Sequence, residues 1–299
     1  MRLRGFRRAD LAAYARITRE AGAADGAVRA FTRRDAEEYL AQPNLNPERD
    51  CFLAEVDGHA AGYVLVVPEL VIGRSIIEGA VAPRYRRQGI GRRLLDHGVA
   101  HSRTLGAERA HTSVSSEGTA ARRLFEAAGF VEARRQLHMR LDLEDLVAGD
   151  GPTEHVVRHL RDGEEAVMTD LQNRAFTGSW GFAPNTPEEM AYRLRMRGSR
   201  FEDALILEVE GRPAAYCWTK MEARGNDPGG VIWMIGVDPA MRGLGLGRAM
   251  LLASVDYLAR QGARSVKLDV YADNAPAVNL YEATGFRRRG EIIFYEKRL

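Results

Sequence analysis

Apolar positions along the chain follow helical and strand spacing in an order that occurs twice. In the second half, Leu251, Val255 and Leu258 fall on one stripe of a helix that ends at Gly262. The apolar, β-branched segment 266–271 that follows predicts a buried strand. Each half reads as helices, strands joined by a tight turn, a glycine loop, a helix, a strand, a helix and a last strand. The pattern predicts a mixed α/β fold.

The order repeats because the sequence itself repeats. Residues 81–92 match residues 237–248 at a shift of 156, and the same shift carries 128–130 onto 284–286. Upstream, segments 52–58 and 206–211 match at a shift of 153, which implies a small change in length between the two landmarks. Gly149, Asp150, Gly151 and Pro152 mark a linker near the middle of the chain. We expect two domains, 1–148 and 149–299.

Composition agrees with two soluble globular domains. The chain has 299 residues, 45% hydrophobic and 28% charged, and no apolar run approaches the roughly 18 residues that span a bilayer. The basic N-terminus has no signal-peptide core, because Tyr14 and Arg16 interrupt its apolar run. We expect a cytoplasmic protein.

Charge and cysteine content exclude several classes of partner. The net charge of +2 gives no field that would draw the chain onto nucleic acid or a membrane. The short arginine runs 134–135 and 287–289 are typical of solvated strand ends. Cys51 and Cys217 lie in apolar segments without metal-ligand spacing, so we expect buried, reduced thiols and no metal.

The glycine loop at 242–247 comes between a strand and a helix. Free amides at the helix start and the positive end of the helix dipole favour a phosphate, and glycine lets it approach closely. A P-loop would need Lys and Ser or Thr after the last glycine, where Arg248 and Ala249 stand. A dinucleotide fingerprint would need another glycine spacing near the start of the domain. A glycine-lined turn without a ligand remains an alternative for both loops.

The two loops resemble the acetyl-CoA signature of the GNAT superfamily, Arg-x-x-Gly-x-Gly after Val-x-Pro. Residues 274–286 are similar to the second family motif, Asn-x-x-Ala-x-x-Leu-Tyr-x-x-x-Gly-Phe. The resemblance implies two tandem GNAT domains, each a central mixed sheet with helices on both faces, and acetyl-CoA as cofactor. It also implies that the strand at 235–237 splays from its parallel neighbour and binds pantetheine. The expected cofactor contacts are Ile235, Val237, Arg242, Gly243, Leu244, Gly245, Leu246, Gly247 and Arg248, and in the first half Val81, Arg86, Arg87, Gln88, Gly89, Ile90, Gly91 and Arg92.

The resemblance assigns catalytic roles in the second half. Tyr281 would be the general acid that protonates the leaving thiolate, and Asn274 would position the cofactor or the helix start. The first half has Phe125 and Gly118 at these positions. We therefore expect the chemistry in the second copy and a catalytically degenerate first copy.

The general base is not identified by the sequence. Glu78 stands where the family often holds its base, and its counterpart in the second half is Met234. Candidates in the second half are Glu222, Asp227, a carboxylate acting through water, and the terminal carboxylate of Leu299, which would close the last strand beside the site.

The acceptor side is expected at the loop 176–189. Phe176, Trp180 and Phe182 could form the wall of an acceptor site or a local core. The segment 186–189, Thr-Pro-Glu-Glu, has the pattern of a capped helix start, so its acids have a structural explanation.

The expected function is N-acetylation, by direct attack in a ternary complex, of a primary amine on a small molecule or peptide. The acceptor loop and two-copy layout also resemble mycothiol synthase, a two-copy GNAT enzyme, whose acceptor is a cysteinyl pseudodisaccharide. A third possibility is a non-catalytic acyl-CoA sensor or scaffold. We expect a monomer or homodimer.

Overall fold

The computed structural model describes residues 1–26, 31–147, 155–196, 198–222 and 228–299. It divides the chain into two compact units, Met1–Arg134 with Ile292–Leu299, and Arg135–Glu291. The mixed α/β fold predicted from the sequence is confirmed in both. The predicted boundary between residues 148 and 149 falls among 148–154, which lie outside the described residues.

The first unit is a mixed sheet in the order β1-β2-β3-β4-β5-β12, in which β4 and β5 are parallel and the other pairs antiparallel. Its elements are β1 (Arg2–Gly5), α1 (Leu11–Ala24), α2 (Arg33–Leu40), α3 (Pro47–Asp50), β2 (Cys51–Val56), β3 (His59–Glu69), β4 (Arg74–Val81), α4 (Ile90–Thr104), β5 (Arg109–Ser115), α5 (Thr119–Ala127) and most of β12 (Arg287–Arg298).

The second unit repeats this plan in the order β7-β8-β9-β10-β11-β6, with β10 and β11 as the parallel pair. Its elements are most of β6 (Val131–Asp142), β7 (Val156–His159), α6 (Glu165–Phe176), α7 (Pro187–Leu194), β8 (Ala204–Val209), β9 (Arg212–Glu222), β10 (Gly229–Val237), α8 (Leu246–Arg260), β11 (Ser265–Tyr271) and α9 (Ala275–Ala283).

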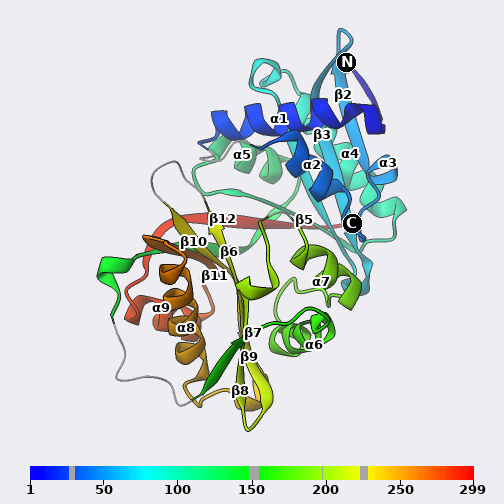
Figure 1. Cartoon of the computed structure of the whole chain (residues 1–299). Helices are drawn as coiled ribbons and strands as arrows, with labels where there is room; N and C mark the ends of the chain where they lie inside the picture. Colours follow the sequence, from blue (N-terminus) through cyan, green and yellow to red (C-terminus); the bar gives the residue numbers. More distant parts are fainter. Residues whose placement is uncertain (27–30, 148–154, 197, 223–227) are drawn as a thin grey trace. The chain divides into compact units, whose positions relative to one another are not determined.

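Each sheet separates two cores, because alternate side chains of a strand point to opposite faces. On β9, Ala215 and Cys217 pack under α8, whereas Tyr216 and Trp218 pack under α6 and α7. Figure 1 shows α8 and α9 on one face of the second sheet and α6 and α7 on the other. On β3, Val64 belongs to the core on the α4 side, and Leu65 to the core on the α1 side.

The last strand of each repeat completes the sheet of the other repeat. Strand β6 ends the first repeat but pairs with β11 from Gln136↔Tyr271 to Asp142↔Ser265. Strand β12 ends the second repeat but pairs with β5 from Ile292↔Ser115 to Arg298↔Arg109. The compact units therefore differ from contiguous halves by an exchange of the terminal strand.

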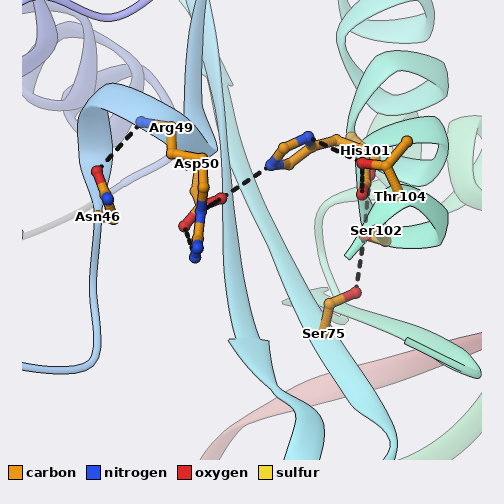
Figure 2. Close-up of polar contacts among 8 residues, drawn as sticks. Asn46, Arg49, Asp50, Ser75, His101, Ser102 and Thr104 are labelled. Atoms are coloured by element: carbon orange, nitrogen blue, oxygen red, sulfur yellow. Dashed lines mark hydrogen bonds and ion pairs between the residues drawn. The ribbon is translucent and has the colours of Figure 1, made fainter. Parts of the chain in front are cut away.

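A buried carboxylate fixes α4 in the first unit (Figure 2). Asp50 is buried. Its Oδ2 accepts from Arg49 Nη2 at 2.8 Å, and its Oδ1 lies 2.9 Å from His101 Nε2. Ser75 Oγ on β4 donates to Ser102 Oγ on α4 at 2.8 Å. These contacts hold α4, which begins at the first glycine loop, against the sheet.

The strand exchange predicts that core mutations act on the unit of the other repeat. Ile293→Ala on β12 should lower the free energy of unfolding by about 2–5 kcal/mol and reduce amide protection in β5, because the buried Ile293 packs in the first unit. Leu141→Ala on β6 is the matched variant and should reduce protection in β11. Hydrogen exchange resolved by segment measures both. Loss of protection in β11 for Ile293→Ala would contradict the exchange.

Candidate active site

The second glycine loop opens at the start of α8. Gly243 and Gly245 have φ of +82° and +76°, a left-handed conformation that glycine adopts without strain. A Cβ built at either position would meet nothing within 4 Å, so the space beside the loop is open. The first intrahelical bond is from Ala249 N to Gly245 O, which leaves the amides of residues 246–248 available. The geometry suits an anion bound to backbone amides.

The first loop has the same conformation. Gly89 at the start of α4 has φ +76° and ψ −2°, the values of Gly245. Arg87 takes the position of Gly243 with φ +63°, a region that non-glycine residues enter at a cost of order 1 kcal/mol. The first copy therefore keeps the cradle even where its sequence departs from glycine.

The arginine at the start of each loop hydrogen-bonds to a backbone carbonyl of the unit's earlier helix. Arg242 Nη2 donates to Ala175 O in the last turn of α6 at 2.7 Å. Arg86 makes the corresponding bond to Ala21 O at 3.5 Å and an ion pair with Asp25 at 2.7 Å. This bond ties the loop to the last turn of α6, and the guanidinium of Arg242 keeps its positive charge.

Strand β10 leaves its parallel neighbour before the loop. The β10–β11 pairing ends at Ile232↔Leu268, whereas β10 stays paired with β9 as far as Val237↔Ala215. The backbone of residues 233–237 is therefore open along the edge that faces away from β9. This is the splay that the family resemblance implies for Ile235 and Val237.

A β-bulge marks the same strand. On β9, Thr219 pairs with Ile232 and the next residue, Trp218, pairs with Met234, so Trp233 is an extra residue. The first copy has no such irregularity between β3 and β4. Relative to the first copy, the bulge adds one residue and the connection between β9 and β10 adds two. These three residues explain why the shift between matching positions of the repeat changes from 153 to 156.

Tyr281 lies on α9 with its ring in the core of the second unit. It is 6% exposed, and its hydroxyl makes no hydrogen bond among the described residues. Burial, and to a smaller extent the Cys217 thiol, raises the pKa of Tyr281 above the usual tyrosine value. The hydroxyl therefore stays protonated near neutral pH and can donate.

Asn274 caps the start of α9, since its Oδ1 accepts from Ala277 N at 3.4 Å. Of its two expected roles, the structure shows the one at the helix start. In the first unit α5 begins after Gly118, which has no side chain for a cap, and Phe125 stands at the position of Tyr281. The first copy thus lacks both groups.

The strand register confirms that Glu78 and Met234 are equivalent. Glu78 pairs with Leu65 across β3–β4, and Met234 with Trp218 across β9–β10. Glu78 Oε2 accepts from Tyr39 Oη at 2.8 Å, and burial raises the pKa of Glu78. One copy therefore holds the carboxylate and the other the tyrosine.

The structure places the candidates for the general base in different surroundings. Glu222 lies 3.9 Å from Lys267 and is partly exposed. Asp227 lies outside the described residues. Leu299, expected to end the last strand beside the second site, belongs instead to the first unit, where β12 pairs with β5 and Leu299 N donates to Glu108 O.

The three aromatic residues of the expected acceptor loop have different neighbours. The rings of Phe176 and Phe182 lie 5.6 Å apart, whereas Trp180 contacts Tyr271 on β11 edge-on at 5.7 Å. The segment after the loop is a capped helix start, in which Thr186 Oγ1 accepts from Glu189 N and the Glu189 carboxylate from Thr186 N. The structural explanation of these acids is confirmed.

Sequence reasoning missed an aromatic stack at the bulge. Trp233, 56% exposed, stacks on Trp218 with ring centroids 5.9 Å apart, and Lys220 Nζ lies 5.2 Å from the Trp233 ring centroid. The change of repeat shift between the two landmarks was the one signal of an inserted residue here.

The comparisons with known proteins agree with this geometry. The family described as Acetyltransferase (GNAT) family matches residues 16–130 and 166–286. A mycothiol acetyltransferase of Geodermatophilus obscurus is 34% identical over 300 residues, covering 94% of this chain and 92% of its own. One from Acidothermus cellulolyticus is 31% identical over 84% of this chain and 81% of its own.

Solved structures show the same fold. A GCN5-related N-acetyltransferase from Sphaerobacter thermophilus is 25% identical with a TM-score of 0.73, over 99% of this chain and 95% of its own. A tandem GNAT protein from the clavulanic acid biosynthesis pathway is 19% identical with a TM-score of 0.71, over 99% and 98%. Among the described residues, none of the helices has the length and apolar character needed to cross a membrane.

The partly buried Glu78 predicts a pH-dependent stability. Because its folded pKa is raised, the protonated form is favoured in the folded state, and stability falls as pH rises from the ordinary value of about 4.5 through the raised one. Glu78→Gln keeps an acceptor for Tyr39 and should increase the free energy of unfolding at pH 7.5 relative to wild type, with no gain near pH 4. Urea unfolding at both pH values measures it. A less stable variant at pH 7.5 would mean that a charged Glu78 stabilises the fold.

Proposed function

The chain belongs to the GNAT family of acetyltransferases, and from that premise we propose that its second copy acetylates a primary amine of a small molecule or peptide with acetyl-CoA. The observation that carries the proposal is the unpaired, protonated hydroxyl of Tyr281 in the unit that also has the open helix start and the splayed strand. The first copy has the helix start without the tyrosine.

The residues of the second copy fit coenzyme A. The open space beside Gly243 and Gly245, with the free amides at residues 246–248, suits the diphosphate. The unpaired edge at Ile235 and Val237 suits the amides of pantetheine, which hydrogen-bond as an added strand does. A Cβ built at Gly247 would lie at ordinary contact distances, 3.7 Å, from the side chains of Leu280 and Val237. When bound, acetyl-CoA supplies the activated acyl group.

The proposed mechanism is direct attack by the amine in a ternary complex. The backbone amides and the β10 edge orient the thioester, and Tyr281 donates its proton to the sulfur as the carbon–sulfur bond breaks. The amine nitrogen forms the new bond to carbon and loses one proton, so the proton lost at nitrogen balances the one gained at sulfur. Because Met234 replaces a carboxylate, we propose that this proton leaves through water.

Removing the Tyr281 hydroxyl tests the proposal. Tyr281→Phe should lower turnover at least tenfold with unchanged acetyl-CoA binding, because only a proton transfer in the transition state is lost. Turnover is followed by thiol release over a panel of amines that includes cysteinyl pseudodisaccharides, aminoglycosides and short peptides.

Tyr257→Phe is the control for this variant, since Tyr257 Oη donates to Asp203 Oδ1 at 2.8 Å and its loss should affect stability alone. Equal turnover in wild type and Tyr281→Phe would remove Tyr281 from the chemistry. Binding of acetyl-CoA without transfer to any amine would favour the alternative of an acyl-CoA sensor or scaffold.

The first copy is proposed to bind coenzyme A as well, because its loop conformation matches that of the second. Calorimetry should give two molecules per chain. Arg92→Glu and Arg248→Glu place an anion in the first turn of α4 and α8, and each should weaken one of the two sites at least tenfold. A stoichiometry of one in wild type would contradict binding by the first copy.

A narrower proposal concerns the acceptor. The relatives that match this chain over most of its length are named mycothiol acetyltransferases. This favours a cysteinyl pseudodisaccharide among the amines of the panel, and its preferred acetylation would establish the narrower function.

A further inference from the structure

Three polar atoms on the α6 side of the second sheet are buried without a hydrogen-bond partner. They are Gln172 Oε1, Tyr216 Oη and Trp218 Nε1, in side chains that are 4%, 0% and 5% exposed. Buried polar atoms normally have partners, and an unsatisfied one costs about 1–3 kcal/mol. Three such atoms on one face of the sheet indicate that their hydrogen-bond partner is a molecule other than the chain.

The three residues share one layer of the unit. Tyr216 and Trp218 are two residues apart on β9, so both point to the face covered by α6 and α7. Gln172 lies one turn before Ala175 on α6, which packs on the same strands. A Cβ at Gly236 would lie 2.9 Å from Ala175 and 2.8 Å from the Tyr216 ring, so this end of α6 lies directly over Tyr216.

The equivalent positions in the first copy show the same groups with partners inside the chain. Ala21 on α1 and Ala175 on α6 are equivalent, because each carbonyl accepts from the loop arginine of its own copy. Three residues before them stand Thr18 and Gln172, which therefore correspond. Tyr63, opposite Ala80 on β4, corresponds to Tyr216, opposite Gly236 on β10.

In the first copy these polar groups satisfy one another. Thr18 Oγ1 donates to Tyr14 O at 2.9 Å and lies 3.0 Å from Tyr63 Oη, and Tyr63 also shares a hydrogen bond with Tyr14. Leu65, with no polar atom, stands where the second copy has Trp218. Equivalent positions therefore carry hydrogen-bonded polar groups in the first copy and polar groups without partners in the second.

The chemistry of the open atoms defines their ligand. The indole N–H only donates, the amide oxygen only accepts, and the tyrosine hydroxyl does both. None carries charge, since burial also raises the pKa of Tyr216 well above its usual value. Such a set matches neutral hydroxyl groups better than a carboxylate or an ammonium group. The aromatic rings of Trp218 and Trp233 offer the apolar surface that a sugar ring also presents.

We propose that Gln172, Tyr216 and Trp218 bind hydroxyl groups on a ring of the acceptor, and so select hydroxylated amines. This inference rests on the proposed transfer by the second copy and adds a specificity determinant to it. The three atoms are buried, so binding of the acceptor in this way requires the side chains over them to move. Phe176, at the loop end of α6 and 3.1 Å from the Cβ position of Gly236, covers this region.

A matched pair of acceptors tests the selection. The cysteine amides of glucosamine and of cyclohexylamine carry the same α-amine on rings with and without hydroxyl groups. Wild type should favour the hydroxylated probe at least tenfold in kcat/KM, because a site that hydrogen-bonds hydroxyl groups rejects the analogue that lacks them. Gln172→Leu and Tyr216→Phe should each reduce this preference at least threefold through the acceptor KM, with an unchanged KM for acetyl-CoA. Thr18→Val and Tyr63→Phe in the first copy should leave the preference unchanged.

Thermal unfolding gives a readout that does not depend on the acceptor. Tyr63→Phe removes a satisfied hydroxyl and should lower the Tm by a few degrees, whereas Tyr216→Phe removes an unsatisfied one and should leave it unchanged or raise it. A similar fall for both variants would mean that Tyr216 already has a partner, such as a buried water, and would overturn the proposal.

The kinetic outcomes separate this proposal from the function on which it rests. Equal use of the two probes by wild type, or transfer to other amines and to neither probe, overturns selection of hydroxylated acceptors. A wild-type chain that binds acetyl-CoA and acetylates no amine refutes the proposed function, and the Tm comparison then still decides whether Tyr216 is unpaired.

Discussion

The parting of β10 from β11 after Ile232 is the constraint on which the site of the second unit depends. A parallel pair that continued to Val237 would use the backbone groups of both strands in its own ladder. Because β9 holds β10 in place on the other side, the free edge is offered by a fixed strand rather than a loose one. The bulge at Trp233 falls at this point, and the strand leads directly into the turn at Gly245 that begins α8.

The sequence predicts those parts of the site that depend on local backbone conformation. The loop at Gly243 and Gly245 was recognisable because a left-handed turn before a helix favours glycine, and the cap at Asn274 because few residues can accept from the first turn. The two-copy α/β plan followed from a repeat that places equivalent strands at equivalent intervals. These features need only residues near in sequence, which is why the prediction of the fold was confirmed in both units.

What the sequence does not predict is the choice among equivalent long-range partners. Strands β6 and β12 hold the same place in their repeats, so the pattern of either suits the edge beside β5 or beside β11. The exchange also places Leu299 in the first unit. Gln172 and Tyr216 read as ordinary helix and strand residues, because the sequence does not show whether a buried polar atom finds a partner. Comparison of the two copies in space shows it.

The exchange gives the first copy a structural role that is separate from catalysis. Phe125 and Gly118 show that this copy has lost the tyrosine and the helix cap of the second, yet its strand β6 supplies the antiparallel neighbour of β11. Without β6 the ladder groups from Ser265 to Tyr271 would have no partner on that side, and β11 would become an edge strand beside the splayed β10. The contact of Thr18 with Tyr63 in the first copy satisfies polar groups whose counterparts in the second copy, Gln172 Oε1 and Tyr216 Oη, have no hydrogen-bond partner. The first repeat is therefore required by the second unit whatever its own chemistry, because its strand β6 completes the sheet that holds β11 and β10.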